Sequence, residues 1–355
     1  MPKIDPHTAT TRHQIYLQRV ATHEALTFDD FLRESDKIVK DVLGRVNFDT
    51  RKDLTKTIAE LRERLGVNYD EWTKLLLNDL NELSSAEARF SSEVLKNATI
   101  DQTIRLPTAA KVWQSANVIP LQTNTNGESK LLQPFVKDFT SAEVSRINGV
   151  IRNGFYTGMT SNTISKSIRG TRVNNFKDGI LDISRRAANI IARTSVNHVA
   201  STARMMTFEE NEDILNGWIF SATLDSKTST ICRHYDGEKF KLGEGPLPPI
   251  HISCRSSSIP DIKSEYDIFD TAGTRASIGA DGGAQTGKSP YYNWLKTQPA
   301  AFQDEILGKK MGQVFRNSGI STDGFRKLTT NNLGEPLTIK QMTAKNPSVF
   351  ATVDN

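Results

Sequence analysis

The chain has 355 residues, of which 37% are hydrophobic and 24% charged, and its net charge is +4 at pH 7. This length suits about two domains, no apolar run reaches the ~20 residues of a membrane helix, and the charge is too small to indicate a nucleic-acid-binding protein by itself. The polar start of the chain does not resemble a secretory signal, and two cysteines exclude a disulfide scaffold, so a reducing cytosol is expected.

The first part of the chain is predicted to be mainly helical. Residues 1–26 are polar and contain two prolines, which favours a flexible arm. Thr27 followed by Asp30 predicts a helix start, and apolar residues at helical spacing continue over residues 27–97, with a break at Gly66. These stripes are interpreted as helix–helix core.

Prolines interrupt this pattern over residues 98–134, which also contain the polar run from Thr123 to Gly127. This stretch is therefore interpreted as a linker. Helical spacing returns over residues 140–154, and Thr160 is expected to cap a further short helix.

The clearest helix of the sequence covers residues 178–211, and the β-branched and aromatic run at residues 216–220 predicts a strand directly after it. Glycine and proline then predict loops and short strands. The expected fold is α+β, with a helical N-terminal half, a small loop-rich α+β module over residues 135–270, and an extended C-terminal segment, residues 271–355, with short helices.

An ordered series of motifs runs from this helix into the loops. Arg193-Thr194 comes first, then Gly217-Trp218, then a turn and helix start with Asp225, Thr228 and Cys232, and then Asp236-Gly237. The series closes on Pro249, His251, Cys254 and Arg255. This order resembles the phage Mu F-like head-morphogenesis family, and residues 291–338 look like the tail of many such proteins. The resemblance assigns a structural role to the motif residues Arg193, Thr194, Asp225, Thr228, Asp236, Gly237, Pro249 and Arg255.

The sequence departs from the family pattern at three positions. Lys227 stands where the family usually has Arg, and Ser229 and Ser256 stand where Cys is common. Any four-thiol metal site of relatives is therefore incomplete in this chain.

The resemblance implies a minor head protein of a tailed phage. Such a protein resides in the virion head, after assembly in the host cytoplasm, without contact with a membrane in the assembled head. Its expected partners are the portal protein and other head proteins, with phage DNA as a further candidate, and its expected role is in head assembly, DNA packaging or genome delivery. No catalysis is expected. The alternatives are a DNA-binding internal head or ejection protein, and an enzyme, either a Cys–His hydrolase or a nucleotide-binding enzyme.

Cys232, His251 and Cys254 are the strongest candidates for chemistry. His251 and Cys254 have the spacing of a ligand pair in a tight turn, and His234 is a tentative fourth ligand, so the set suits zinc. The alternatives are buried packing of the two cysteines, a disulfide, which the expected compartment disfavours, and a catalytic Cys–His pair, which needs an orienting acid such as Asp225 or Asp236.

Residues 282–289 match the phosphate-loop pattern G-x-x-x-x-G-K-[ST]. A buried strand should precede such a loop and a helix should follow it, but residues 274–281 contain one large apolar residue, Ile278, and Pro290 follows directly. A flexible Gly-rich linker is therefore the preferred interpretation over a nucleotide site.

Residues 152–204 hold nine Lys or Arg and two Asp, a net charge of 9 − 2 = +7. This stretch is a candidate surface for DNA phosphates or for an acidic portal surface, and the alternative is a solvated helix face balanced by acidic neighbours. Arg193 is also expected to pair with Asp225. The candidate DNA- or portal-binding residues are Arg152, Lys166, Arg169, Arg172, Lys177, Arg185 and Arg186.

Overall fold

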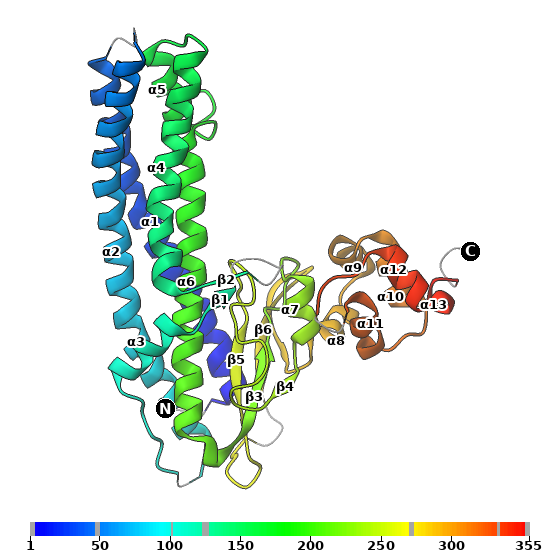
Figure 1. The fold of residues 1–355 in the computed structure, drawn as a ribbon. Helices are drawn as coiled ribbons and strands as arrows, with labels where there is room; N and C mark the ends of the chain where they lie inside the picture. The colour runs from blue at the N-terminus through cyan, green and yellow to red at the C-terminus, as the bar shows by residue number, and fades with distance from the viewer. Residues whose placement is uncertain are drawn as a thin grey trace.

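Four long helices form an up-and-down bundle in this computed structural model (Figure 1). The structure describes residues 4–46, 50–100, 102–122, 128–269, 273–331 and 334–351. Within these ranges, no helix has the length and hydrophobicity that a membrane crossing requires. The bundle helices are α1 (Pro6–Gly44), α2 (Arg51–Ala98), α4 (Leu132–Tyr156) and α6 (Ile180–Glu210).

The predicted flexible arm is wrong, because α1 already begins at Pro6. The Asp5 carboxylate caps this helix by accepting from the Thr8 N–H, and a proline at the first helical position suits the start of a helix. The predicted start at Thr27 lies inside α1. The buried face over residues 6–26 consists largely of small and polar residues, so hydrophobicity alone does not reveal it.

Helix α2 is continuous, and the break expected at Gly66 does not occur. A glycine inside a helix costs about 1 kcal/mol relative to alanine. Leu65 and Tyr69, on either side of it, are fully buried, and their burial offsets that cost. Thr50 and Asp53 form a capping box at the start of the helix.

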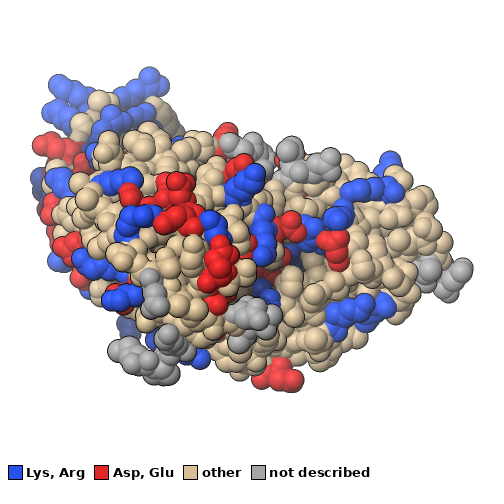
Figure 2. Space-filling model, turned by 90° about the horizontal axis from the view of Figure 1, so that it is seen from below, with Lys and Arg blue, Asp and Glu red and all other residues tan. Residues whose placement is uncertain are grey.

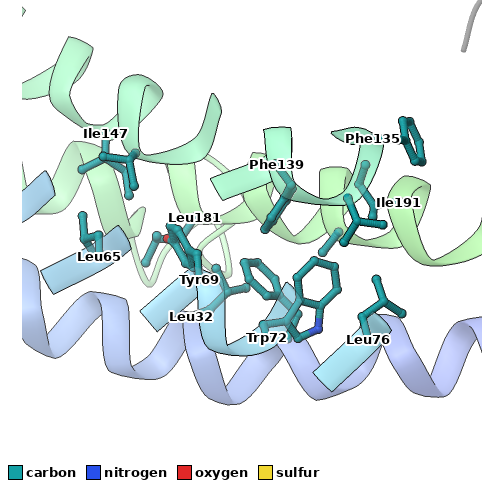
Figure 3. Packing of buried hydrophobic residues seen from close by; sticks show 14 of the residues in the cluster. Leu32, Leu65, Tyr69, Trp72, Leu76, Phe135, Phe139, Ile147, Leu181 and Ile191 are labelled. Atoms are coloured by element: carbon teal, nitrogen blue, oxygen red, sulfur yellow. The ribbon is translucent and has the colours of Figure 1, made fainter. Parts of the chain in front are cut away.

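The aromatic centre of the bundle core joins three helices. Phe28 of α1, Tyr69 and Trp72 of α2, and Phe139 of α4 pack with ring centroids 4.9–6.1 Å apart. Figure 3 shows Tyr69, Trp72 and Phe139 converging between the helices, with Leu181 and Ile191 of α6 in the same core. The interpretation of the N-terminal stripes as helix–helix core is therefore correct.

The predicted linker over residues 98–134 is folded where it is described. It contains α3 (Ala109–Val118) and a hairpin of β1 (Leu121–Gln122) and β2 (Ser129–Lys130). Val112 and Ala116 of α3 are fully buried. The polar run at residues 123–127 lies outside the described residues.

A short helix, α5 (Ser161–Arg169), closes the end of the bundle at which α1 joins α2 (Figure 1). Thr160 caps α5 as predicted, by accepting from the Thr163 N–H. The Ser161 hydroxyl donates to the carbonyl of Val46, just beyond α1. This contact holds the α4–α5 connection against the α1–α2 connection.

At its other end the bundle carries the α+β module. The η1 turn (Glu212–Ile214) leads from α6 into the predicted strand, β3 (Leu215–Ser221), which lies between β4 (Lys239–Phe240) and β5 (Ser257–Ile262) in an antiparallel sheet. The short helix α7 (Thr230–Tyr235) follows β3. Trp218 and Phe220 are fully buried in the core of this module, so Trp218 is a core residue.

The C-terminal segment contains short helices as predicted, but the helices form a compact lobe, so the prediction of an extended segment is wrong. A hairpin of β6 (Thr274–Gly279) and β7 (Gly282–Gly287) comes first. Tyr291, Trp294, Phe315 and Phe325 are buried in a separate core. The lobe, on the far side of the sheet from the bundle in Figure 1, comprises α8 (Tyr291–Lys296), α9 (Ala300–Leu307), α10 (Lys309–Asn317), α11 (Thr322–Thr329), α12 (Ile339–Lys345) and α13 (Pro347–Ala351).

Candidate functional site

Cys232, His251 and Cys254 come together as one cluster, in which both cysteines are buried and His251 is half-buried. The Cys232 Sγ lies 3.2 Å from the His251 Nε2 and 3.7 Å from the Cys254 Sγ. Cys232 is on α7, and Ser229 caps that helix by accepting from the Cys232 N–H. The Ser229 Oγ also lies 2.9 Å from the His251 Nε2.

Helix α6 positions the turn that carries His251 and Cys254. The Cys254 N–H donates to the His251 carbonyl, and between them Ser253 adopts the left-handed conformation, with φ +55°. The Thr194 hydroxyl accepts from the Ser253 N–H at 2.9 Å, and the Asn197 side-chain amide donates to the Cys254 carbonyl at 2.9 Å. Thr194 belongs to the motif found in the sequence. Asn197 was missed, because a polar residue in the middle of a helix carries no local signal.

Burial and the neighbouring Cys254 raise the pKa of the Cys232 thiol. Burial also opposes a charged Cys254, but hydrogen bonds from Cys232 and His251 lower the pKa of its thiol well below the usual range. The cluster thus favours a single thiolate at Cys254.

The tentative fourth ligand, His234, is wrong, and the alternative of a catalytic Cys–His pair is not supported. His234 is not part of the cluster, because its Nδ1 lies 2.6 Å from the Thr330 hydroxyl and contacts the C-terminal lobe. Among the residues that the structure describes, no acid orients His251 as a catalytic pair requires, since its Nδ1 lies 2.8 Å from the carbonyl of Ile252. Asp225 and Asp236 are each engaged by an arginine instead.

Asp225 organises the turn after β3. It accepts from the Lys227 N–H and from the Thr228 hydroxyl, both at 3.0 Å, as the expected turn requires. Its partner is Arg255 and not Arg193, because Arg255 binds it with two guanidinium nitrogens. Although burial opposes a charged carboxylate, Arg255 lowers the pKa of Asp225. Arg193 instead donates within the bundle, to the side chains of Asn189, Gln18 and Thr22.

Asp236 joins the α+β module to the C-terminal lobe. Its carboxylate accepts from the Ala222 and Tyr291 N–H groups and from two nitrogens of the buried Arg275. The Tyr291 hydroxyl in turn donates to the Asp225 carbonyl at 2.7 Å. Arg275 was missed in the sequence, because its partner lies 39 positions away.

The motif residues Gly237 and Pro249 are explained by the shape of the backbone around them. Gly237 has a φ of +86°, and a Cβ there would lie 2.9 Å from Pro290, so the position suits glycine. Pro249 is buried beside Ile250 in the module. These positions shape the loops around the sheet.

The phosphate-loop match is not a nucleotide site. Residues 282–287 form β7, an exposed strand paired only with β6, and α8 begins after Pro290. A phosphate loop must connect a buried strand to a helix N-terminus. The expectation of a flexible linker here is also wrong, since the segment is one strand of a hairpin.

The basic stretch of residues 152–204 divides into paired and unpaired cations. Arg185 pairs with Asp29 and Asp182, and Arg186 lies 3.4 Å from Asp182. Arg169 lies over the ring of Phe176. The exposed cations that form no ion pair with a described residue are Arg152, Lys166, Arg172 and Lys177.

These four cations lie around α5, at the closed end of the bundle, where Arg51 and Lys52 of α2 are exposed as well. Large apolar side chains are also exposed there. Val173 is 91% exposed and Tyr156 65%. On the face at the opposite end, viewed from below in Figure 2, basic and acidic side chains alternate across the middle of the surface. We call the following residues the bundle tip: Arg51, Lys52, Arg152, Tyr156, Met159, Lys166, Arg172, Val173, Phe176 and Lys177.

The fold is therefore that of an α+β protein in which Thr194, Asp225 and Asp236 of the motif series make contacts that hold turns and neighbouring elements together. Residues 145–259 match the family model described as Phage Mu protein F like protein, which confirms the resemblance to the phage head-morphogenesis family for this segment. The match covers the α5 end of the bundle and the Cys–His cluster, and it ends inside β5. No curated protein and no solved structure matches the chain.

Proposed function

We propose that this chain is a minor head protein of a tailed phage that binds the portal protein through the bundle tip. The family match supports a role in phage head morphogenesis. The observation that supports the tip as the working surface is its combination of unpaired cations and exposed apolar side chains at one end of the bundle.

The chemistry of the tip suits an acidic protein surface with apolar hollows. Aromatic residues and arginine are enriched in protein interfaces, and the tip offers Tyr156, Phe176 and Arg172. Opposite charges on the partner would steer the encounter and fix its orientation. Val173 and Tyr156 would supply apolar area that is removed from water on binding.

The shape of the molecule separates the tip from the rest of the chain. Helix α2 has 48 residues and is therefore about 70 Å long. With the tip bound at the portal, the sheet module and the C-terminal lobe would extend from that vertex toward other head proteins. Attachment there would give the chain its role in head assembly, packaging or genome delivery.

The experiment is a direct binding measurement with purified portal rings. The tip variant carries Lys166→Glu, Arg172→Glu and Lys177→Glu. We expect its dissociation constant to rise by about tenfold or more at physiological salt, because the change replaces attraction by repulsion. The control variant has the same change of charge on exposed lysines of the lobe, and we expect it to bind within about twofold of the wild type. The control substitutions are Lys296→Glu, Lys309→Glu and Lys340→Glu.

DNA binding through the same cations is the second candidate function, supported by their net positive charge. It predicts a steep fall of affinity with salt concentration, because each neutralised phosphate releases counterions. A phosphate contact does not need the exposed Val173. Weakening of portal binding by Val173→Ser, with DNA binding unchanged, would favour the protein partner, whereas equal portal affinity for the tip and control variants would refute the proposed function.

The structure offers no support for a catalytic role. The only Cys–His cluster among the described residues has no orienting acid among them, and Cys254, the cysteine whose thiol has the lowered pKa, is fully buried and therefore closed to a substrate. The activity we propose is binding alone.

A further inference from the structure

We propose that Cys232, His251 and Cys254 bind one Zn²⁺ ion, which fastens α7 to the turn of residues 251–254. The three ligand atoms all lie within 4.8 Å of one another. This inference is independent of the proposed function, because the site lies in the α+β module and the bundle tip lies beyond the other end of α6 (Figure 1).

The distances suit tetrahedral coordination. Zinc binds thiolate sulfur at about 2.3 Å and imidazole nitrogen at about 2.0–2.1 Å. Tetrahedral angles then place two sulfurs about 3.8 Å apart, and a sulfur and a nitrogen about 3.6 Å apart. In the structure the two Sγ atoms are 3.7 Å apart, and the Cys232 Sγ lies 3.2 Å from the His251 Nε2. Small side-chain adjustments are sufficient to admit the ion.

His251 presents the correct nitrogen. A bond between the His251 Nδ1 and the Ile252 carbonyl, 2.8 Å away, requires a proton on Nδ1, because the carbonyl oxygen can only accept. When the ring is neutral, its lone pair is therefore on Nε2, the nitrogen that lies 3.2 Å from the Cys232 Sγ and is free to bind the ion. Metal-binding histidines are commonly oriented in this way, with the second nitrogen donating to a carbonyl or carboxylate.

The charge balance also suits zinc. Cys232 and Cys254 are 2% and 0% exposed, so both sulfurs are shielded from bulk water, while His251 is half-buried. A buried net charge is costly, but two thiolates and one neutral imidazole cancel the charge of Zn²⁺. No further counter-ion is required.

A fourth ligand is available beside the cluster. A cavity of about 30 Å³ is lined by Ser229, Cys232 and His251, and this volume can hold a water molecule. The Ser229 hydroxyl lies 2.9 Å from the His251 Nε2, so either this oxygen or a water completes the tetrahedron. Because the cavity has room for little more than that, the site is structural and not catalytic.

The ion would connect α7 to the turn of residues 251–254, which is itself held by α6. Cys232 is on α7, the other two ligands are on the turn, and Thr194 of α6 holds that turn through Ser253. The loops between β4 and β5 contain few apolar residues, so a metal clip would stabilise a region in which hydrophobic burial is small.

The first experiment measures metal in the full chain, purified without chelator under reducing conditions from cells grown with added zinc. We expect about one zinc per chain, and Co²⁺ exchanged into the site should show the absorption bands of thiolate-bound tetrahedral cobalt. Cys254→Ser should lose most of the zinc. His234→Ala is the matched control, and it should retain zinc because His234 lies outside the cluster.

A gain-of-ligand variant keeps the test informative if Cys254→Ser fails to fold. Ser229→Cys places a third thiol beside the His251 Nε2, and we expect the dissociation constant for Zn²⁺ to fall by at least about tenfold. Less than about one zinc per ten chains in the wild type, with both thiols free to react after denaturation, would overturn the proposal. A disulfide between Cys232 and Cys254 in the protein purified without oxidant would overturn it too.

Discussion

At the scale of single residues, the Asp236–Arg275 pair is the most buried ion pair among the described residues. The two side chains are 0% and 2% exposed, and four hydrogen bonds reach the carboxylate. A buried pair contributes little net stability while it is intact, but removing one charge leaves the other uncompensated.

We therefore expect Asp236→Asn to lower the free energy of unfolding by about 3–5 kcal/mol. Urea denaturation of the full chain measures this effect. Asp138→Asn is the control, since it breaks the exposed pair with Lys130 and should change the midpoint little. Equal midpoints for the two variants would contradict the role assigned to Asp236.

The lowered pKa of His7 predicts that the stability of the protein depends on pH. Its burial, with Arg275 and Lys288 nearby, lowers its pKa to about 3. Because the folded pKa lies below the unfolded value of 6.5, the folded state resists protonation, so the contribution of His7 is complete above pH 6.5 and is lost as the pH falls.

Between pH 6.5 and 5 this loss amounts to about 2 kcal/mol for His7 alone. His7→Gln removes the titration, so its free energy of unfolding should fall less steeply over this range than that of the wild type. Parallel curves for the two proteins would show that His7 is accessible to protons in the folded state.

Residue chemistry was predictable where it depends on local sequence. The Asp225 turn and the Thr160 cap follow from neighbours two or three positions away. The pairing of Arg193 with Asp225 was wrong, because the choice between Arg193 and Arg255 depends on how the loop folds back over α6.

At the scale of elements, two glycines of α4 distinguish an open helix surface from a packed one. A Cβ at Gly149 would meet nothing within 4 Å, whereas a Cβ at Gly154 would lie 2.4 Å from the Ile164 side chain of α5. Of these two glycines, therefore, only Gly154 is required for the close packing of α5 against α4.

Gly149→Ala should stabilise the protein by up to about 1 kcal/mol, the difference in helix propensity. Gly154→Ala should destabilise it, since Ile164 and with it α5 must move. Thermal denaturation compares the two variants. The packing of α5 would be disproved if the two substitutions raised the melting temperature equally.

Helices with a strong apolar stripe were predictable, and α6 and the strand after it agree with the prediction to within two residues. The first half of α1, residues 6–26, was not predictable, because its buried face includes Thr10, Gln14 and Ala21, which pack through tertiary contacts. The compact C-terminal lobe was missed for a similar reason. Its helices have only five to nine residues, too few to show a clear period.

At the scale of the whole molecule, the start of the bundle is tied to the hairpin of β6 and β7. Thr8 of α1 bonds with Thr274 of β6, so the start of the bundle holds the hairpin that leads into the lobe. The excess of cations over residues 152–204 was visible in the sequence. Which of them form ion pairs was not, because one acid that pairs with Arg185 is Asp29, 156 positions away.

The bundle tip appeared only in three dimensions, since α2, α4, α5 and the loop before α6 each contribute part of it. Such a composite surface has no sequence motif. It combines the charge predicted from the sequence with apolar side chains that sequence patterns alone would place in a core.

The measurement that tests this account most directly is the amount of the chain retained in purified phage heads. Heads are assembled with the wild type, with the tip variant (Lys166→Glu, Arg172→Glu, Lys177→Glu) or with the matched lobe variant, and the copies per head are counted by quantitative mass spectrometry. We predict wild-type copy numbers for the lobe variant and a loss of most copies for the tip variant. Full retention of a folded tip variant would contradict attachment through the bundle tip.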